Sequence, residues 1–142
     1  MKNLIVSSLL FLGIQMIFPL SVYSKSGIKS VVKVSYSVID KNFNFYQLSF
    51  KKKQILINDT CYKKMKNCLA LKAYDFAPTL KTDLQTLSAG GKDPGSVMCE
   101  IFHGEVFMAL DKRQNHLAFC LFKDGSAIDS SDLFVAFNEK NG

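Results

Sequence analysis

Before residue 60 the chain alternates hydrophobic and polar residues in the way that half-buried β-strands require. From residue 32 to residue 38 every second side chain is apolar, with lysine or serine between, and this period of two is typical of a strand with one buried face. Residues 43–50 and 54–58 are two further apolar runs, joined by short polar turns. Parallel strands need a long crossover, so such turns favour antiparallel pairing. The pattern predicts an antiparallel β-meander, with a weaker fourth strand at residues 69–74.

After Pro78 the apolar period lengthens to that of a helix. Leu80, Leu84 and Leu87 lie four and three residues apart, which places them on one face of a helix. The glycine pair at residues 90–91 is a typical helix terminator. A helix is therefore predicted between Pro78 and these glycines.

A second, shorter helix is predicted directly afterwards. Asp93 is a suitable N-cap, and Pro94 fits the first helical position, where its missing N–H is harmless. Apolar side chains recur on one face up to Phe102, and Gly104 provides a C-terminal stop. Because so short a helix is unstable alone in water, we expect packing or a covalent bond to hold it.

The next segment has the pattern of a β-hairpin. Residues 105–111 and 116–122 are apolar runs on either side of the polar loop 112–115. With these four residues as the loop, Phe107 lies opposite Cys120. Both faces of the hairpin are then apolar, so we expect both to be covered.

A turn at Asp124-Gly125 and a short helix at residues 129–137 complete the pattern. The predicted fold class is α+β. It has an antiparallel β-meander in a front region, residues 25–91, and a helix–hairpin–helix module in residues 92–142.

The first 24 residues have the pattern of a cleavable secretory signal. Lys2 precedes an apolar run at residues 4–20, and Val22-Tyr23-Ser24 supplies the small and medium residues of a processing site. A retained membrane anchor is the alternative, but it normally carries charged flanks on both sides. We therefore expect an exported protein, periplasmic or secreted, that begins at Lys25 after cleavage near Ser24.

Four cysteines in a small exported chain are typical of a disulfide framework. A bond between Cys61 and Cys68 predicts a loop there, because in one continuous helix their Cα atoms would lie about 10 Å apart. A bond between Cys99 and Cys120 would tie the short helix to the hairpin. We expect both disulfides.

Three other roles for Cys99 compete with the disulfide. A zinc site would need His103, His116 and Cys120, but on a strand the last two lie about 13 Å apart and do not share one metal. A nucleophilic pair with His103 would place the thiol away from the helix N-terminus that lowers a thiol pKa. A free buried thiol is the third alternative. The disulfide fits best, and neither a metal nor a cofactor is expected.

The net charge is unevenly distributed. Residues 25–81 contain twelve lysines and three aspartates, a net charge of +9, whereas residues 82–142 contain five basic and nine acidic groups, a net charge of −4. Arg113 is the one arginine, so the forked donors suited to nucleic acid are scarce and no nucleic-acid partner is expected. The lysine-rich loops of the front region are candidates for weak contact with an anionic membrane surface: Lys51, Lys52, Lys53, Lys63, Lys64 and Lys66.

Motifs in residues 92–137 resemble a small exported family, domain of unknown function family 333, whose members often carry the label hemolysin. Its pattern of N-P-A-S-x-x-C, a glycine, a hairpin and C-x-x-P-D-G-S is matched by Asp93-Pro94-x-Ser96-x-x-Cys99, Gly104, Cys120-x-x-x-Asp124-Gly125-Ser126 and an acidic helix start at Asp129. His103, Lys123 and Ser131 replace the family's glycine, proline and tryptophan. The resemblance implies export and a compact disulfide-linked module, and it brings no catalytic residues.

These observations favour a non-enzymatic binding or structural module of the envelope or the extracellular space, with an unidentified partner there. The rival hypothesis is a membrane-active, hemolysin-like factor that works through the lysine-rich front region.

Overall fold

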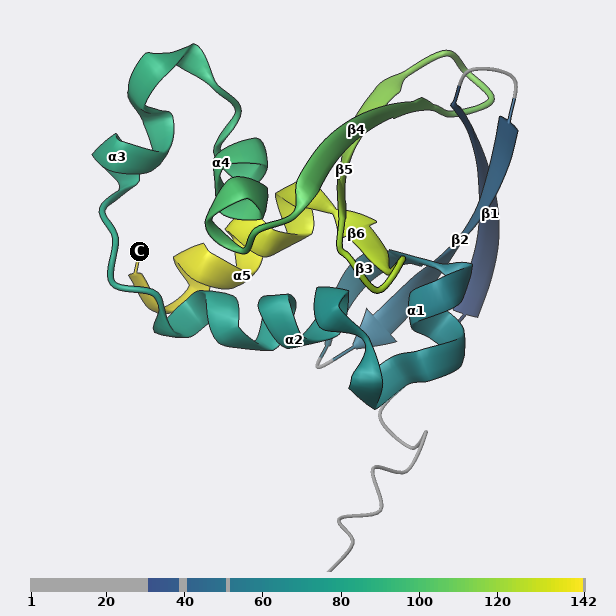
Figure 1. The fold of residues 1–142 in the computed structure, drawn as a ribbon, viewed down its shortest axis with the longest axis horizontal. Helices are drawn as coiled ribbons and strands as arrows, with labels where there is room; N and C mark the ends of the chain where they lie inside the picture. The colour runs from purple at the N-terminus through teal and green to yellow at the C-terminus, as the bar shows by residue number, and fades with distance from the viewer. Residues whose placement is uncertain (1–30, 39–40, 51, 142) are drawn as a thin grey trace, which may run out of the picture.

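The computed structural model describes residues 31–38, 41–50 and 52–141. The predicted signal peptide and Lys51 lie outside these residues. Within them the fold is mixed α+β, a sheet with helices packed on one side (Figure 1). The strands are β1 (Val31–Val38), β2 (Lys41–Phe50), β3 (Lys53–Asn58), β4 (Glu105–Leu110), β5 (His116–Leu121) and β6 (Ala127–Asp129).

Helices connect and follow the two groups of strands. The α-helices are α1 (Asp59–Lys64), α2 (Leu69–Phe76), α3 (Leu84–Ser88), α4 (Pro94–Ile101) and α5 (Ser130–Asn141). Single 3₁₀ turns are η2 (Met65–Asn67), η3 (Ala77–Thr79) and η4 (Ala89–Gly91). None of the helices in the described residues has the length and hydropathy needed to span a membrane.

The sheet is a closed barrel with the strand order β1-β2-β3-β6-β5-β4. The predicted meander is present as β1-β2-β3, and a second antiparallel meander, β4-β5-β6, completes the barrel. The predicted front meander is therefore only part of the sheet, which also includes the strands of the hairpin and closes into a barrel. Ile57 pairs with Ile128 to join β3 to β6, and Ser37 pairs with Leu110 to join β1 to β4. Closure leaves the outer strands of each meander with a partner, which an open sheet does not provide.

Alternating side chains of the barrel build two cores. The inner core contains Phe45 and Phe119, whose ring centroids lie 4.1 Å apart, and Tyr36, whose edge meets both rings. The outer core lies between the barrel and the helices. On β3, Leu56 belongs to the inner core while Ile55 and Ile57 belong to the outer core. A strand buried on both faces in this way reads as a continuous apolar run.

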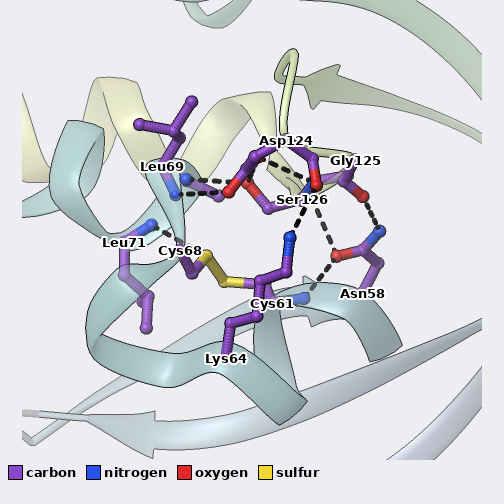
Figure 2. The surroundings of a disulfide bond; sticks show 11 residues. Asn58, Cys61, Lys64, Cys68, Leu69, Leu71, Asp124, Gly125 and Ser126 are labelled. Carbon is purple, nitrogen blue, oxygen red and sulfur yellow. Dashed lines mark hydrogen bonds between the residues drawn. A yellow bond between two sulfur atoms is a disulfide. The ribbon is translucent and has the colours of Figure 1, made fainter.

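Residues 69–74 form helix α2, so the prediction of a fourth strand was wrong. The side chains of Ala70, Leu71, Ala73 and Tyr74 are buried, which is the spacing of one helix face. The N-terminus of α2 is capped by distant residues. Figure 2 shows the N–H groups of residues 69–71 donating to Asp124, Ser126 and Cys68.

The helix predicted after Pro78 is shorter than expected. A 3₁₀ turn ends at Thr79, and α3 begins only at Leu84. Leu87 is buried, and the glycines at 90–91 adopt the left-handed conformation, with φ of 76° and 70°. That conformation is open to glycine at little cost, so the predicted end of the helix is confirmed.

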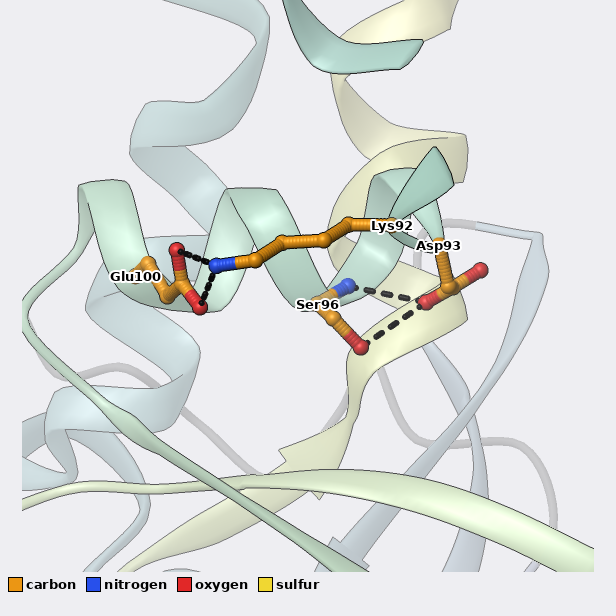
Figure 3. Close-up of polar contacts among 4 residues, drawn as sticks. All are labelled: Lys92, Asp93, Ser96 and Glu100. Atoms are coloured by element: carbon orange, nitrogen blue, oxygen red, sulfur yellow. Dashed lines mark hydrogen bonds and ion pairs between the residues drawn. The ribbon is translucent and has the colours of Figure 1, made fainter. Parts of the chain in front are cut away.

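Helix α4 begins as predicted. The carboxylate of Asp93 accepts from the Ser96 N–H at 2.8 Å (Figure 3), and Pro94 occupies the first turn. Lys92 reaches along the helix to Glu100 at 2.8 Å, an exposed pair of little energetic weight. The stop differs from the prediction, because His103, rather than Gly104, takes the left-handed conformation with φ 58°.

The hairpin is present, but its register is shifted by one residue. Leu110 pairs with His116 and Phe107 with Phe119, so the predicted pairing of Phe107 with Cys120 was wrong. Asp111 belongs to the loop, because its carboxylate accepts from two loop N–H groups at 2.7 and 2.9 Å. Because of this one-residue shift in register, the side chains of Phe107 and Phe119 both point into the barrel.

Coverage of the outer hairpin face is partial. Val106 and Cys120 pack against the helices in the outer core. Met108, on the same face, is 51% exposed. The expectation that both faces are covered therefore holds for only part of the hairpin.

All four cysteines are in disulfides, Cys61–Cys68 and Cys99–Cys120, with Cα atoms 5.0 and 5.4 Å apart. Bonds of this kind persist in oxidising compartments outside the cytosol. The predicted loop between Cys61 and Cys68 is partly helical. Helix α1 contains Cys61 and ends at Lys64, and Met65, with φ 43°, then redirects the chain toward Cys68.

Gly104 marks the closest approach of the chain to the second disulfide. A Cβ atom at this position would lie 2.8 Å from the Sγ of Cys99 and closer still to the Sγ of Cys120. No side chain fits there without displacing the sulfur atoms.

We predict that Gly104→Ala destabilises the protein by about 1–3 kcal/mol through this overlap. In the Cys99→Ala/Cys120→Ala background both sulfur atoms are gone, so the same substitution should cost far less. The disulfide itself should contribute about 2–5 kcal/mol. Urea unfolding of the four proteins gives the coupling free energy. An equal cost of Gly104→Ala in both backgrounds would show that the sulfur atoms are not what excludes a side chain.

Candidate functional site

The N-terminus of α2 is fixed by the turn that joins β5 to β6. Asp124 Oδ2 accepts from the Leu69 N–H at 3.0 Å, and Ser126 Oγ accepts from the Ala70 N–H at 3.1 Å (Figure 2). Ser126 in turn donates to Asp124. These bonds satisfy N–H groups that a helix leaves without internal partners.

Asn58, at the end of β3, holds the same turn from the other side. Its side-chain oxygen accepts from the N–H groups of Cys61 and Ala127 at 3.0 and 2.9 Å, and its nitrogen donates to the Gly125 carbonyl at 2.8 Å. One side chain thus caps α1 and positions the start of β6. The turn, the disulfide between Cys61 and Cys68 and the start of α2 form one connected unit.

The carboxyl group of Asp124 is ionised within this unit. Burial raises the pKa of its carboxyl, but hydrogen bonds from Ser126 and from the Leu69 N–H outweigh burial and hold the pKa below its usual value. The carboxylate also lies at the positive end of the α2 dipole. Both effects favour the ionised form.

The end of α4 faces α2 across a hollow. The disulfide joins Cys99 of α4 to Cys120 of β5, and the Gly104 N–H donates to the Cys99 carbonyl at 2.9 Å. These bonds place Phe102 opposite Phe76 of α2, with ring centroids 6.3 Å apart in an edge-to-face arrangement.

Between these elements lies a cavity of about 400 Å³, which we call the α2–α4 pocket. Its lining comes from α2, from the end of α4 and from the residues that follow β5. The lining residues are Leu69, Lys72, Ala73, Phe76, Phe102, His103, Phe122 and Lys123.

The lining is apolar with a cationic rim. Phe76 is 57% exposed, whereas Ala73 and Phe122 are buried at the base. The ionisable groups of the lining are Lys72, His103 and Lys123, all exposed. An exposed apolar hollow with a few convergent polar groups is the usual form of a small-molecule site.

A second, more polar cavity of about 270 Å³ lies at the end of the barrel where Asp129 and Asp132 meet Tyr36 and two glutamines. Asp132 accepts from the Leu56 N–H at 2.8 Å. Burial, with a smaller effect from the negative charge of Asp129, raises the pKa of Asp132 to about 7, against the lowering effect of the hydrogen bond from Leu56.

The lysines predicted to contact an anionic surface lie in two separate places. Lys52 and Lys53 are at the β2–β3 turn, whereas Lys63 and Lys64 are on α1, beyond the other end of β3. That strand has six residues, a length of about 20 Å at roughly 3.3 Å per residue. Lys51 and the side chain of Lys66 lie outside the described residues.

Three of these lysines have partners within the protein. Internal pairing leaves less of their charge for an external surface. The partners are Glu139 for Lys53, the Asp59 carboxylate for Lys63 at 2.6 Å, and the Asp124 carbonyl for Lys64 at 2.9 Å.

The disulfide removes Cys99 and Cys120 from zinc or thiol chemistry. His116 lies at the start of β5, while His103 lies on the rim of the α2–α4 pocket. Across the described residues no cluster of three histidine, cysteine or acidic side chains is arranged to hold a metal.

Comparisons with models of protein families, with curated proteins and with solved structures found no match to this chain. The chemistry of the α2–α4 pocket therefore rests on its own residues, above all on the apolar lining and the cationic rim.

The sequence contained one pattern that indicates the α2 wall of this pocket, but the prediction of a strand at residues 69–74 concealed it. Leu69, Ala73 and Phe76 lie four and three residues apart, which is the spacing of a helix face. The rim has no comparable signal, because its residues lie far apart in the chain.

We predict that Asp132 makes stability depend on pH near neutrality. Its folded pKa is about 7, above the unfolded value, so the folded state binds the proton more tightly. The stability that Asp132 contributes is therefore fully present below its unfolded pKa and is lost as the pH rises from there through 7, by on the order of 2–4 kcal/mol in total. The Asp132→Asn variant keeps an oxygen that accepts from the Leu56 N–H. The contribution of this position to its free energy of unfolding should be nearly independent of pH between 5 and 8.5.

Urea unfolding at several pH values measures this effect. Asp129→Asn is the matched control, because it removes the nearby charge and should shift the midpoint to lower pH. Parallel curves for the wild-type protein and Asp132→Asn would contradict the assignment.

Proposed function

We propose that this protein is an exported, non-enzymatic binding module of the envelope or the extracellular space, and that it binds an apolar group in the α2–α4 pocket. Two disulfides support an oxidising location. The apolar run at residues 4–20 supports export by a cleaved signal.

The main observation in support of this function is the apolar hollow between α2 and α4. Its volume of about 400 Å³ lies in the range of ligand pockets, roughly 300–1,000 Å³. Phe76 and Phe102 contact each other edge to face in the lining, and exposing aromatic surface to water is unfavourable unless a ligand covers it.

The walls are held in place before any ligand binds. A disulfide and a hydrogen-bonded turn fix α4 and α2 on the barrel. Preorganisation of this kind reduces the entropy lost on binding. A binding role is also favoured over thiol catalysis, because all four cysteines are held in disulfides.

We predict that Phe76→Ala weakens the binding of an uncharged solvatochromic dye by about fivefold or more. The substitution removes roughly 40–60 Å² of apolar contact, worth about 1–1.5 kcal/mol at 25 cal/mol per Å². Fluorescence titration measures the affinity. Phe76 is 57% exposed, so its truncation should change the melting temperature little.

Met108→Ala is the matched control, since Met108 is 51% exposed and lies outside the pocket lining. It should leave dye affinity unchanged. Equal losses in the two variants, or no dye binding by the wild-type protein, would reject the pocket as the binding site.

We also predict that the exported protein begins at Lys25 and contains both disulfides. Intact mass spectrometry of material from the periplasm or the medium, before and after reduction, measures both properties. Recovery of the exported protein with residues 1–24 still attached would contradict cleavage. Alkylation of Cys99 without prior reduction would contradict the oxidised state.

A further inference from the structure

The rim of the α2–α4 pocket gathers two lysines and a histidine from three separate elements. Lys72 lies on α2, His103 directly follows α4, and Lys123 follows β5. All three side chains are exposed and all three line the same cavity. Their convergence results from tertiary structure, because they are far apart in the sequence.

The two lysines of the rim lack acidic partners. Elsewhere Lys53, Lys63 and Lys92 each pair with a carboxylate. Within the described residues, neither Lys72 nor Lys123 has such a pair, and the pocket lining contains no aspartate or glutamate. The hollow therefore combines an apolar base with uncompensated positive charge at its opening.

The nearest acidic neighbour in the sequence does not cancel this charge by contact. Asp124 follows Lys123, but its oxygens accept from the Leu69 N–H and from Ser126. Its charge is thus directed at the start of α2 and the β5–β6 turn.

His103 extends the polar rim at a conformational cost. With φ 58° it adopts the left-handed conformation, which is less favourable for residues with a Cβ atom than for glycine. The chain carries an imidazole at this position, and that side chain adds a hydrogen-bond donor to the opening of the pocket.

We propose that the ligand of the α2–α4 pocket is a single-chain amphiphile with a carboxylate head, in which the chain fills the apolar base and the carboxylate is held by Lys72 and Lys123. This inference rests on the proposed function. A volume of about 400 Å³ is at the low end for ligand pockets and suits one chain rather than the two of a phospholipid. A free fatty acid is therefore the occupant.

The test compares three ligands with the same twelve-carbon chain: dodecanoate, dodecanol and dodecylammonium. Calorimetric titration of the full mature protein gives the affinities, with the two ionic ligands kept below their micelle concentrations and dodecanol kept below its solubility limit. Dodecanoate should bind about tenfold more tightly than dodecanol, since two exposed ion pairs with the carboxylate act together. Dodecylammonium should bind most weakly. Of the three ligands, only dodecanoate should lose affinity for the protein when salt is added.

Charge-removing variants assign the head group to the rim. Lys72→Gln and Lys123→Gln should each weaken dodecanoate binding about two- to fivefold and leave dodecanol binding unchanged. Lys112→Gln is the matched control, because Lys112 is an exposed lysine of the hairpin loop outside the pocket. It should change neither affinity.

Each contrary outcome has a distinct meaning. Equal affinities for dodecanoate and dodecanol would overturn the acidic head group while leaving an apolar pocket in place. Failure of all three ligands and of the uncharged dye would overturn the proposed function as well. Binding only to vesicles of anionic two-chain phospholipid, without binding of dodecanoate, would overturn the free fatty acid as occupant.

Discussion

The polar turn between β5 and β6 is the interaction on which the rest of the structure depends. Through Asp124 and Ser126 it supplies acceptors to the first N–H groups of α2, and through Asn58 it is bound to the end of β3. Helix α2 has eight residues, too few to be stable alone. Its helical state, and with it one wall of the α2–α4 pocket, is therefore a property of the assembled chain.

The opposite wall depends on a covalent constraint. The disulfide from Cys99 to Cys120 attaches α4 to the barrel, and Gly104 leaves room for the sulfur atoms. One wall held by hydrogen bonds and one held by a covalent bond enclose a cavity whose shape does not require a ligand.

Local signals in the sequence were sufficient for part of this fold. The strands before residue 60 and the start of α4 at Pro94 follow from alternation and capping, which neighbouring residues determine. Helix α2, the hairpin register and barrel closure depend on partners distant in sequence, such as Asp124 and the loop acceptor Asp111. The pocket rim escaped prediction for the same reason.

The single β1–β4 pair has a consequence for access to the barrel interior. In the described residues Ser37 and Leu110 form the one pair that links these strands, so most of the β1 edge lacks ladder hydrogen bonds on that side. Separating the strands there breaks few bonds, and such local opening requires much less free energy than global unfolding. Lys33 places a charge among the exposed Val31 and Val32, which disfavours pairing of this edge with another chain. The junction of β1 with β4 thus closes the barrel through a single ladder pair among the described residues.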